Sequence, residues 1–244
     1  MTELPPSATL SPGPGGHLDP LQDPRAPQLL ATEHWSLLAS RSMSWNEAFS
    51  RTGTFLSTLS AATVALALAG PAMSFNADFR VFALVVLGVT LFLGIATFVR
   101  LSQVNNEDLF WVYGMNQLRG AYARLIPGIE REFITGYTLD AEGISRTFGA
   151  FNVVKVSSLH LLVTTPAVVG VVSSAIAAGI AGLLAVQVGG SMEPTIGLGI
   201  VTFVVSVAMF LAYGRREAST YIARMLALTQ QDAAAAEPRS DASG

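Results

Sequence analysis

The sequence predicts an all-α integral membrane protein, with four transmembrane helices in two hairpins and amphipathic helices on the cytoplasmic side. Of the 244 residues, 51% are hydrophobic and only 13% are charged, which is too apolar for an ordinary soluble domain. Four long runs, at 52–72, 81–99, 161–188 and 195–213, carry no charged side chain. An uncharged apolar run of about 18 or more residues can cross the hydrocarbon core as a helix that satisfies its own backbone hydrogen bonds.

The amino-terminal segment 1–27 is predicted to be a disordered cytoplasmic tail. It holds seven of the twelve prolines and few large apolar residues. Such a segment cannot bury enough surface to offset its ordering entropy. It also lacks the basic and apolar regions of a signal peptide, which indicates that the amino terminus stays on the cytoplasmic side.

Residues 28–51 are predicted to form an amphipathic pre-membrane helix that lies on the membrane or runs into it. Positions such as His34, Arg41 and Trp45 recur at three- and four-residue steps. The alternative is a helix that senses lipids or docks a partner. The spans that follow form a first hairpin over 52–99, because the short loop between them leaves no room for an external domain.

The segment 100–157 is predicted to be cytoplasmic and helical. Asn105 or Asn106 is expected to cap a new helix there, since acidic residues follow in its first turn. Large side chains then alternate at four- and three-residue steps, a seam that packs under the membrane domain or against a second subunit. The seam consists of Trp111, Met115, Leu118, Tyr122 and Leu125. Residues 129–134 are expected to add a short helical turn, and 135–143 a loop.

The second hairpin is predicted over 158–213, and its first helix carries a ridge of small residues. This helix-packing interface consists of Gly170, Ser174, Ala178 and Gly182, spaced four residues apart. Such a ridge lets helix backbones approach closely where lipid gives no hydrophobic drive. Pro166 is expected to kink the entry turn. A cytoplasmic helix at 214–230 and a disordered tail at 231–244 complete the chain.

The basic residues set the predicted orientation. Thirteen of the fourteen Lys and Arg residues lie before the first span, between the second and third, or after the fourth, and only Arg80 borders the other side. The positive-inside rule therefore places both termini in the cytoplasm. Thirteen of the fourteen are Arg, as expected from a high-GC bacterium, so a bacterial cytoplasmic membrane is predicted. The expected membrane-interface anchors are Trp35, Trp45, Arg51, Arg100, Lys155, Arg215 and Arg216.

The composition also excludes several classes of function. The chain has no cysteine, so disulfides and thiolate sites are absent. A net charge of −3 without clustered bases argues against nucleic-acid binding. The spans hold no charged residue of the kind that marks a proton-coupled transporter or an intramembrane protease. No nucleotide, metalloprotease or hydrolase motif is present, so neither enzymatic activity nor a cofactor or metal is expected.

The remaining prediction is a non-catalytic multi-pass membrane protein. Its partners are expected to be the lipid bilayer, a second copy in a homo-oligomer, and a cytoplasmic protein that binds its helices. Assembly is expected through the small-residue faces, with cytoplasmic helices presented for self- or partner association. The alternative is a small transporter or channel with an uncharged pathway lined by Ser and Thr.

Overall fold

The computed structural model describes residues 19–148 and 164–236, and every regular element within these ranges is a helix. Four of the helices are long and apolar enough to cross a membrane, which confirms the all-α prediction with four candidate spans. Lys155 lies outside the described residues. The elements are η1 (Pro20–Gln22), α1 (Ala26–Ala72), α2 (Ala77–Leu125), η2 (Ile129–Glu132), α3 (Ala141–Phe148), α5 (Thr165–Gln187) and α6 (Met192–Ala236).

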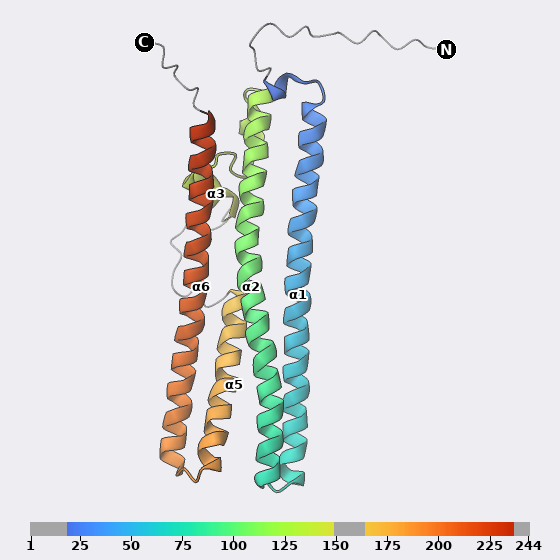
Figure 1. Ribbon diagram of the computed structural model, residues 1–244. Helices are drawn as coiled ribbons and strands as arrows, with labels where there is room; N and C mark the ends of the chain where they lie inside the picture. The colour runs from blue at the N-terminus through green and yellow to red at the C-terminus, as the bar shows by residue number, and fades with distance from the viewer. Residues whose placement is uncertain (1–18, 149–163, 237–244) are drawn as a thin grey trace, which may run out of the picture.

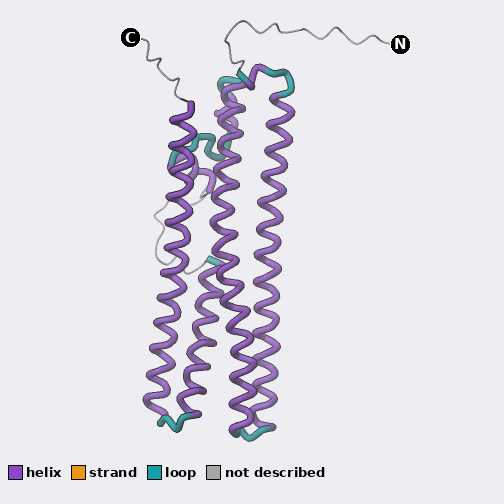
Figure 2. The backbone as a smooth tube through the Cα atoms, viewed as in Figure 1, coloured by secondary structure: helices purple, strands orange, loops and turns teal. Residues whose placement is uncertain are grey.

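The four long helices run along one common direction (Figure 1). Helices α1 and α2 pack side by side and are joined at one end by a short turn at 73–76, and α5 and α6 are joined at the same end (Figure 2). Helix α5 contacts both α2 and α6. It covers only half the length of its neighbours, so the other end of the molecule is built from α1, α2, α6 and α3.

Helices α1, α2 and α6 continue without a break beyond the predicted spans. They contain 47, 49 and 45 residues, and at 1.5 Å per residue each is roughly 70 Å long. Hydrocarbon about 30 Å thick occupies less than half of that length. The predicted divisions at 51/52, 99/100 and 213/214 therefore fall inside continuous helices. Helix also reaches into the two predicted tails, because α1 begins at Ala26 and α6 ends at Ala236.

The predicted helix cap at Asn105 or Asn106 is wrong, because both residues lie inside α2. A cap requires non-helical backbone at the capping residue, and here the helix enters and leaves this pair without interruption. The predicted kink at Pro166 is also wrong. Helix α5 begins at Thr165, which puts Pro166 in the first turn. There the missing N–H has no partner to lose and the fixed φ suits the helix.

The connection between α2 and α5 contains more helix than predicted. The expected turn at 129–134 is present as η2, but α3 begins at Ala141, inside the predicted loop. The Oδ1 atom of Asp140 accepts the N–H of Gly143 at 2.8 Å, which is the hydrogen bond of a helix amino-terminal cap. Glu142 in the first turn adds a favourable charge.

The predicted seam is the last part of a longer one that runs along nearly all of α2. Every position at alternating four- and three-residue steps is buried or half-buried. These positions are Ala83, Leu87, Thr90, Gly94, Thr97, Leu101, Val104, Asp108, Trp111, Met115, Leu118, Tyr122 and Leu125. The spacing is that of helices packed at a small angle, so one packing mode continues through span and extension.

Helix α1 packs against this seam through buried or half-buried positions seven residues apart, which are His34, Arg41, Ala48, Phe55 and Ala62. The apolar core lies where α1, α2 and α5 meet. It is formed by Ala48, Phe55, Phe98, Leu101, Val104, Val169 and Ile176. The seam is apolar at the core residues Leu101 and Val104 and carries one charged residue, Asp108, near its middle, where it faces Arg41 of α1.

Candidate functional site

The candidate site is the part of α1 and α2 beyond the predicted spans, residues 26–51 and 100–125, which we call the stalk. Its central group is Asp108, a seam residue that is only 3% exposed. Arg41 Nε donates to Asp108 Oδ1 at 2.6 Å, and its Nη2 donates to Oδ2 at 3.0 Å. The indole N–H of Trp45 also donates to Oδ1, at 3.0 Å. A buried carboxylate is costly unless it is paired and hydrogen-bonded, so these donors fix the register of α1 on α2.

A second ion cluster lies where the stalk meets the predicted spans. Arg100 Nε and Nη2 donate to the two oxygens of Glu47 at 3.0 and 2.8 Å, and its Nη1 donates to Glu107 at 2.7 Å. Arg51 donates to Glu47 from one turn away, at 2.8 Å. The guanidinium groups of Arg100 and then Arg51 hold the pKa of Glu47 at about 2. Glu47 therefore stays ionised at neutral pH and links the two helices.

His34 lies near the far end of the stalk, against α2. Its ring centroid is 6.3 Å from that of Tyr122, and its Nδ1 is buried without a hydrogen-bond partner among the described residues. Burial first, and then the charge of Arg119, lower the pKa of His34 below its usual 6.5. Burial also lowers the pKa of Arg119, with a further contribution from Arg41. The surroundings at this end of the stalk therefore favour the neutral form of the His34 imidazole.

We expect acidification from pH 7 to pH 5 to destabilise the stalk through His34. The unfolded chain binds the proton with a pKa near 6.5, whereas the folded chain binds it at lower pH. The contribution of neutral His34 to stability is therefore complete above pH 6.5, and it is lost as the pH falls through the pKa of His34 in the folded protein. Thermal unfolding in detergent should show a steeper pH dependence for the wild type than for His34→Gln. Equal slopes would mean that His34 does not contribute.

Asn116 ties the connection between α2 and α3 to the stalk. Its side chain is fully buried, and its Nδ2 donates to the carbonyl oxygen of Thr138 at 2.9 Å. Its Oδ1 accepts from Thr147 at 2.7 Å and from Arg119 at 3.1 Å. No local sequence pattern indicates a role for Asn116, because its partners Thr138 and Thr147 are 22 and 31 residues away. Arg119 adds a contact to the carbonyl oxygen of Gly136 at 3.4 Å, so the connection packs along the face of α2 that holds Asn116 and Arg119.

The small-residue ridge of α5 lies within the molecule. A Cβ atom added at Gly170 would come within 3.3 Å of Phe210 on α6 and 3.4 Å of Phe98 on α2. Ser174 is fully buried and donates to the carbonyl of Gly170 at 2.8 Å. Further along, a Cβ at Gly199 of α6 would lie 3.7 Å from the carbonyl oxygen of Ala178, and one at Gly182 would lie 3.9 Å from Thr195.

The residues expected to anchor at the membrane interface have different surroundings. Trp45, Arg51 and Arg100 bind carboxylates of the stalk, as described above. Trp35 is 73% exposed. Arg215 and Arg216 are both exposed, on the part of α6 that follows the fourth predicted span.

The arrangement provides charge pairing between helices. Within residues 19–148 and 164–236, no three His, Asp or Glu side chains are placed to hold a metal ion. Comparison with protein-family models, curated proteins and solved structures finds no match to this chain. The function is therefore argued from the stalk and the helix packing alone.

Proposed function

We propose that this protein is a non-catalytic multi-pass protein of a bacterial cytoplasmic membrane, which presents its stalk in the cytoplasm for association with a second copy. Four spans cross the bilayer in two hairpins, and both termini are cytoplasmic. The distribution of basic residues supports the orientation, and the length and apolarity of α1, α2, α5 and α6 support the insertion.

The observation that carries this proposal is the continuous seam between α1 and α2. Because the seam does not change at the edge of the predicted spans, the stalk and the spans move as one body. The paired Asp108 near its middle and the Glu47 cluster near its base hold the two helices in one register. Such a stalk suits the rigid presentation of a surface at a fixed distance from the membrane.

The outer face of α1 supports association through the stalk. Leu29, Trp35 and Met43 are 65%, 73% and 71% exposed and lie on one side of the helix. Trp35 precedes Arg51 by sixteen residues, which is about 24 Å along the helix. That distance is too large for a side chain at headgroup depth if α1 crosses the membrane steeply, so we assign Trp35 to protein contact instead.

The hydroxyl groups near the core support packing more than a conducting pathway. Thr90 and Ser174 are buried where α2 and α5 approach, and each donates to a carbonyl of its own helix. Ser173 faces Gly94 across the same contact. These side chains let the helices approach closely, which is the role that small residues commonly have between transmembrane helices.

The topology can be tested with single cysteines, because the chain has none of its own. In intact cells a membrane-impermeant maleimide should label Ala77→Cys, at the start of α2, and Ser191→Cys, in the turn between α5 and α6, because both residues are exposed. It should leave Ile134→Cys unlabelled until the membrane is opened, although Ile134 is 89% exposed. Labelling of Ile134→Cys in intact cells would reject the proposed orientation.

The association can be tested by counting protomers in native-lipid nanodiscs. We expect the wild type to be at least dimeric. Trp35→Glu should shift it towards the monomer, because a charge in the centre of an apolar contact is left unpaired. Gln117→Glu, at an exposed position of α2 away from Leu29, Trp35 and Met43, should leave the number of protomers unchanged. A monomeric wild type, or equal behaviour of the two variants, would contradict self-association through the stalk.

A further inference from the structure

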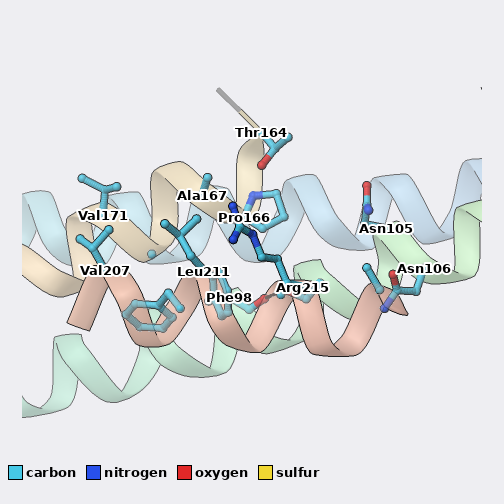
Figure 3. Close-up of a pocket in the computed structure, with 15 residues that line it drawn as sticks. Phe98, Asn105, Asn106, Thr164, Pro166, Ala167, Val171, Val207, Leu211 and Arg215 are labelled. Carbon is cyan, nitrogen blue, oxygen red and sulfur yellow. Dashed lines mark hydrogen bonds between the residues drawn. The ribbon is translucent and has the colours of Figure 1, made fainter. Parts of the chain in front are cut away.

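A cavity of about 200 Å³ lies between α2, α5 and α6. It forms because α5 begins at Thr165 while α2 and α6 continue past this level, so the amino-terminal end of α5 faces the space between them. Figure 3 shows Pro166 and Ala167 on one side of the cavity, with Arg215 of α6 reaching towards Pro166. The same cavity is lined by Asn105 and Asn106 of α2.

The polar end of the cavity is suited to an anion. Arg215 has no carboxylate within ion-pairing distance in the described part of the chain. The first turn of α5 points its positive end at the same space. Among the described residues, no acidic side chain lines the cavity. From the described lining, a negative group that enters would therefore meet the Arg215 charge and neutral dipoles.

Asn106 is the second observation that indicates a ligand. Its side chain lines the cavity and the residue is only 7% exposed, and its amide makes no hydrogen bond to the described residues. The amide opens onto the cavity, so its donor and acceptor are left to partners that occupy that space. A ligand with acceptor oxygens would satisfy this amide beside Arg215.

The other end of the cavity is apolar. It is lined by Phe98 of α2, Val171 of α5, and Val207, Phe210 and Leu211 of α6. These residues belong to the predicted spans, whereas Asn106 and Arg215 lie just beyond them. The cavity thus changes from apolar to polar at the cytoplasmic edge of the spans, as a phospholipid does between its chains and its phosphate.

We propose that this cavity binds an anionic phospholipid of the cytoplasmic leaflet. The phosphate accepts hydrogen bonds from Arg215 and Asn106, and an acyl chain lies along Phe98 and Phe210. The site rests on the membrane insertion and orientation proposed above. A bound lipid would add contacts between α6 and α2, which touch much less than α5 and α6 do.

The test is native mass spectrometry of the full-length, delipidated protein in detergent, titrated with phosphatidylglycerol or phosphatidylcholine. We expect saturable binding of one phosphatidylglycerol per protomer and weaker binding of phosphatidylcholine. Arg215→Gln should weaken phosphatidylglycerol about tenfold or more, because it removes a charged hydrogen bond. Arg216→Gln is the matched control: it removes the same charge at the next residue, outside the cavity, and should stay within about twofold of the wild type.

Asn106→Leu separates lipid binding from folding. It should also weaken phosphatidylglycerol binding, while the melting temperature of the lipid-free protein stays unchanged or rises, because the substitution removes no hydrogen bond between described residues. Equal losses in Arg215→Gln and Arg216→Gln would indicate general surface attraction and overturn the proposal. Displacement of the lipid by millimolar inorganic phosphate would overturn it in favour of a free-anion site.

The titration and the labelling experiment fail independently. Binding in detergent does not depend on which way the protein is inserted, so a reversed topology with intact binding would remove only the assignment to the cytoplasmic leaflet. The proposed topology without saturable binding would remove only the lipid site.

Discussion

Asp108→Ala is expected to destabilise the protein by about 3–5 kcal/mol, the range found when one partner of a buried ion pair is removed. The substitution leaves Arg41 charged and half-buried without its two carboxylate contacts, and it takes the acceptor from Trp45. Unfolding in detergent followed by circular dichroism measures the effect. The stability of Asp108→Asn should fall between that of the wild type and that of Asp108→Ala, because Asn keeps an acceptor oxygen but loses the charge.

The double variant Arg41→Met with Asp108→Leu provides the decisive control. Asp108 occupies a seam position between Val104 and Trp111, where a large apolar residue would continue the pattern. Replacing a buried pair by apolar side chains of similar volume is often neutral or stabilising, so the double variant should recover most of the loss. A double variant as unstable as Asp108→Ala would show that the pair stabilises the folded protein by more than neutralising its own two charges.

The candidate spans could be predicted from the sequence because they depend on local composition. The absence of charge over a long apolar run is visible without any tertiary contact. The helix boundaries depend on something else. Backbone hydrogen bonds between residues four apart do not respond to a change from apolar to polar side chains, so α2 passes through Asn105 and Asn106 unchanged. The predicted boundaries followed the composition, whereas the helices followed the backbone.

The full seam was hidden by its small residues. Within the predicted span, Thr90, Gly94 and Thr97 occupy seam positions, and none of them stands out among large apolar neighbours. The pairing of Asp108 with Arg41 joins residues 67 positions apart, which no local pattern reveals. A signal was nevertheless present: Asp108 falls on the four-three spacing that leads to Trp111, and a carboxylate at such a position needs a cationic partner.

Phe55→Ala is expected to cost about 3–5 kcal/mol, as for other buried aromatic residues truncated to alanine. Phe55 is 1% exposed and belongs to the core where α1, α2 and α5 meet. A Cβ added at Gly94 of α2 would lie 2.9 Å from its ring, so the ring fills the notch that this glycine leaves. Truncation would open a cavity there, because Gly94 has no side chain with which to close it.

Phe92→Ala is the matched control, because it makes the same chemical change in α2 at a residue that is 70% exposed. Its ring faces lipid in the proposed topology, and little packing within the protein is lost when it is removed. We expect Phe92→Ala to change the free energy of unfolding by less than about 1 kcal/mol.

Gly94→Ala tests the contact between Phe55 and Gly94 from its other side. The added methyl group would meet Phe55 and Ser173, and overpacking of this kind costs about 1–3 kcal/mol. In the double variant Phe55→Ala with Gly94→Ala, the methyl group would partly fill the cavity, so the loss should be smaller than the sum of the two single losses. Strictly additive losses would show that the ring and the glycine do not pack against each other.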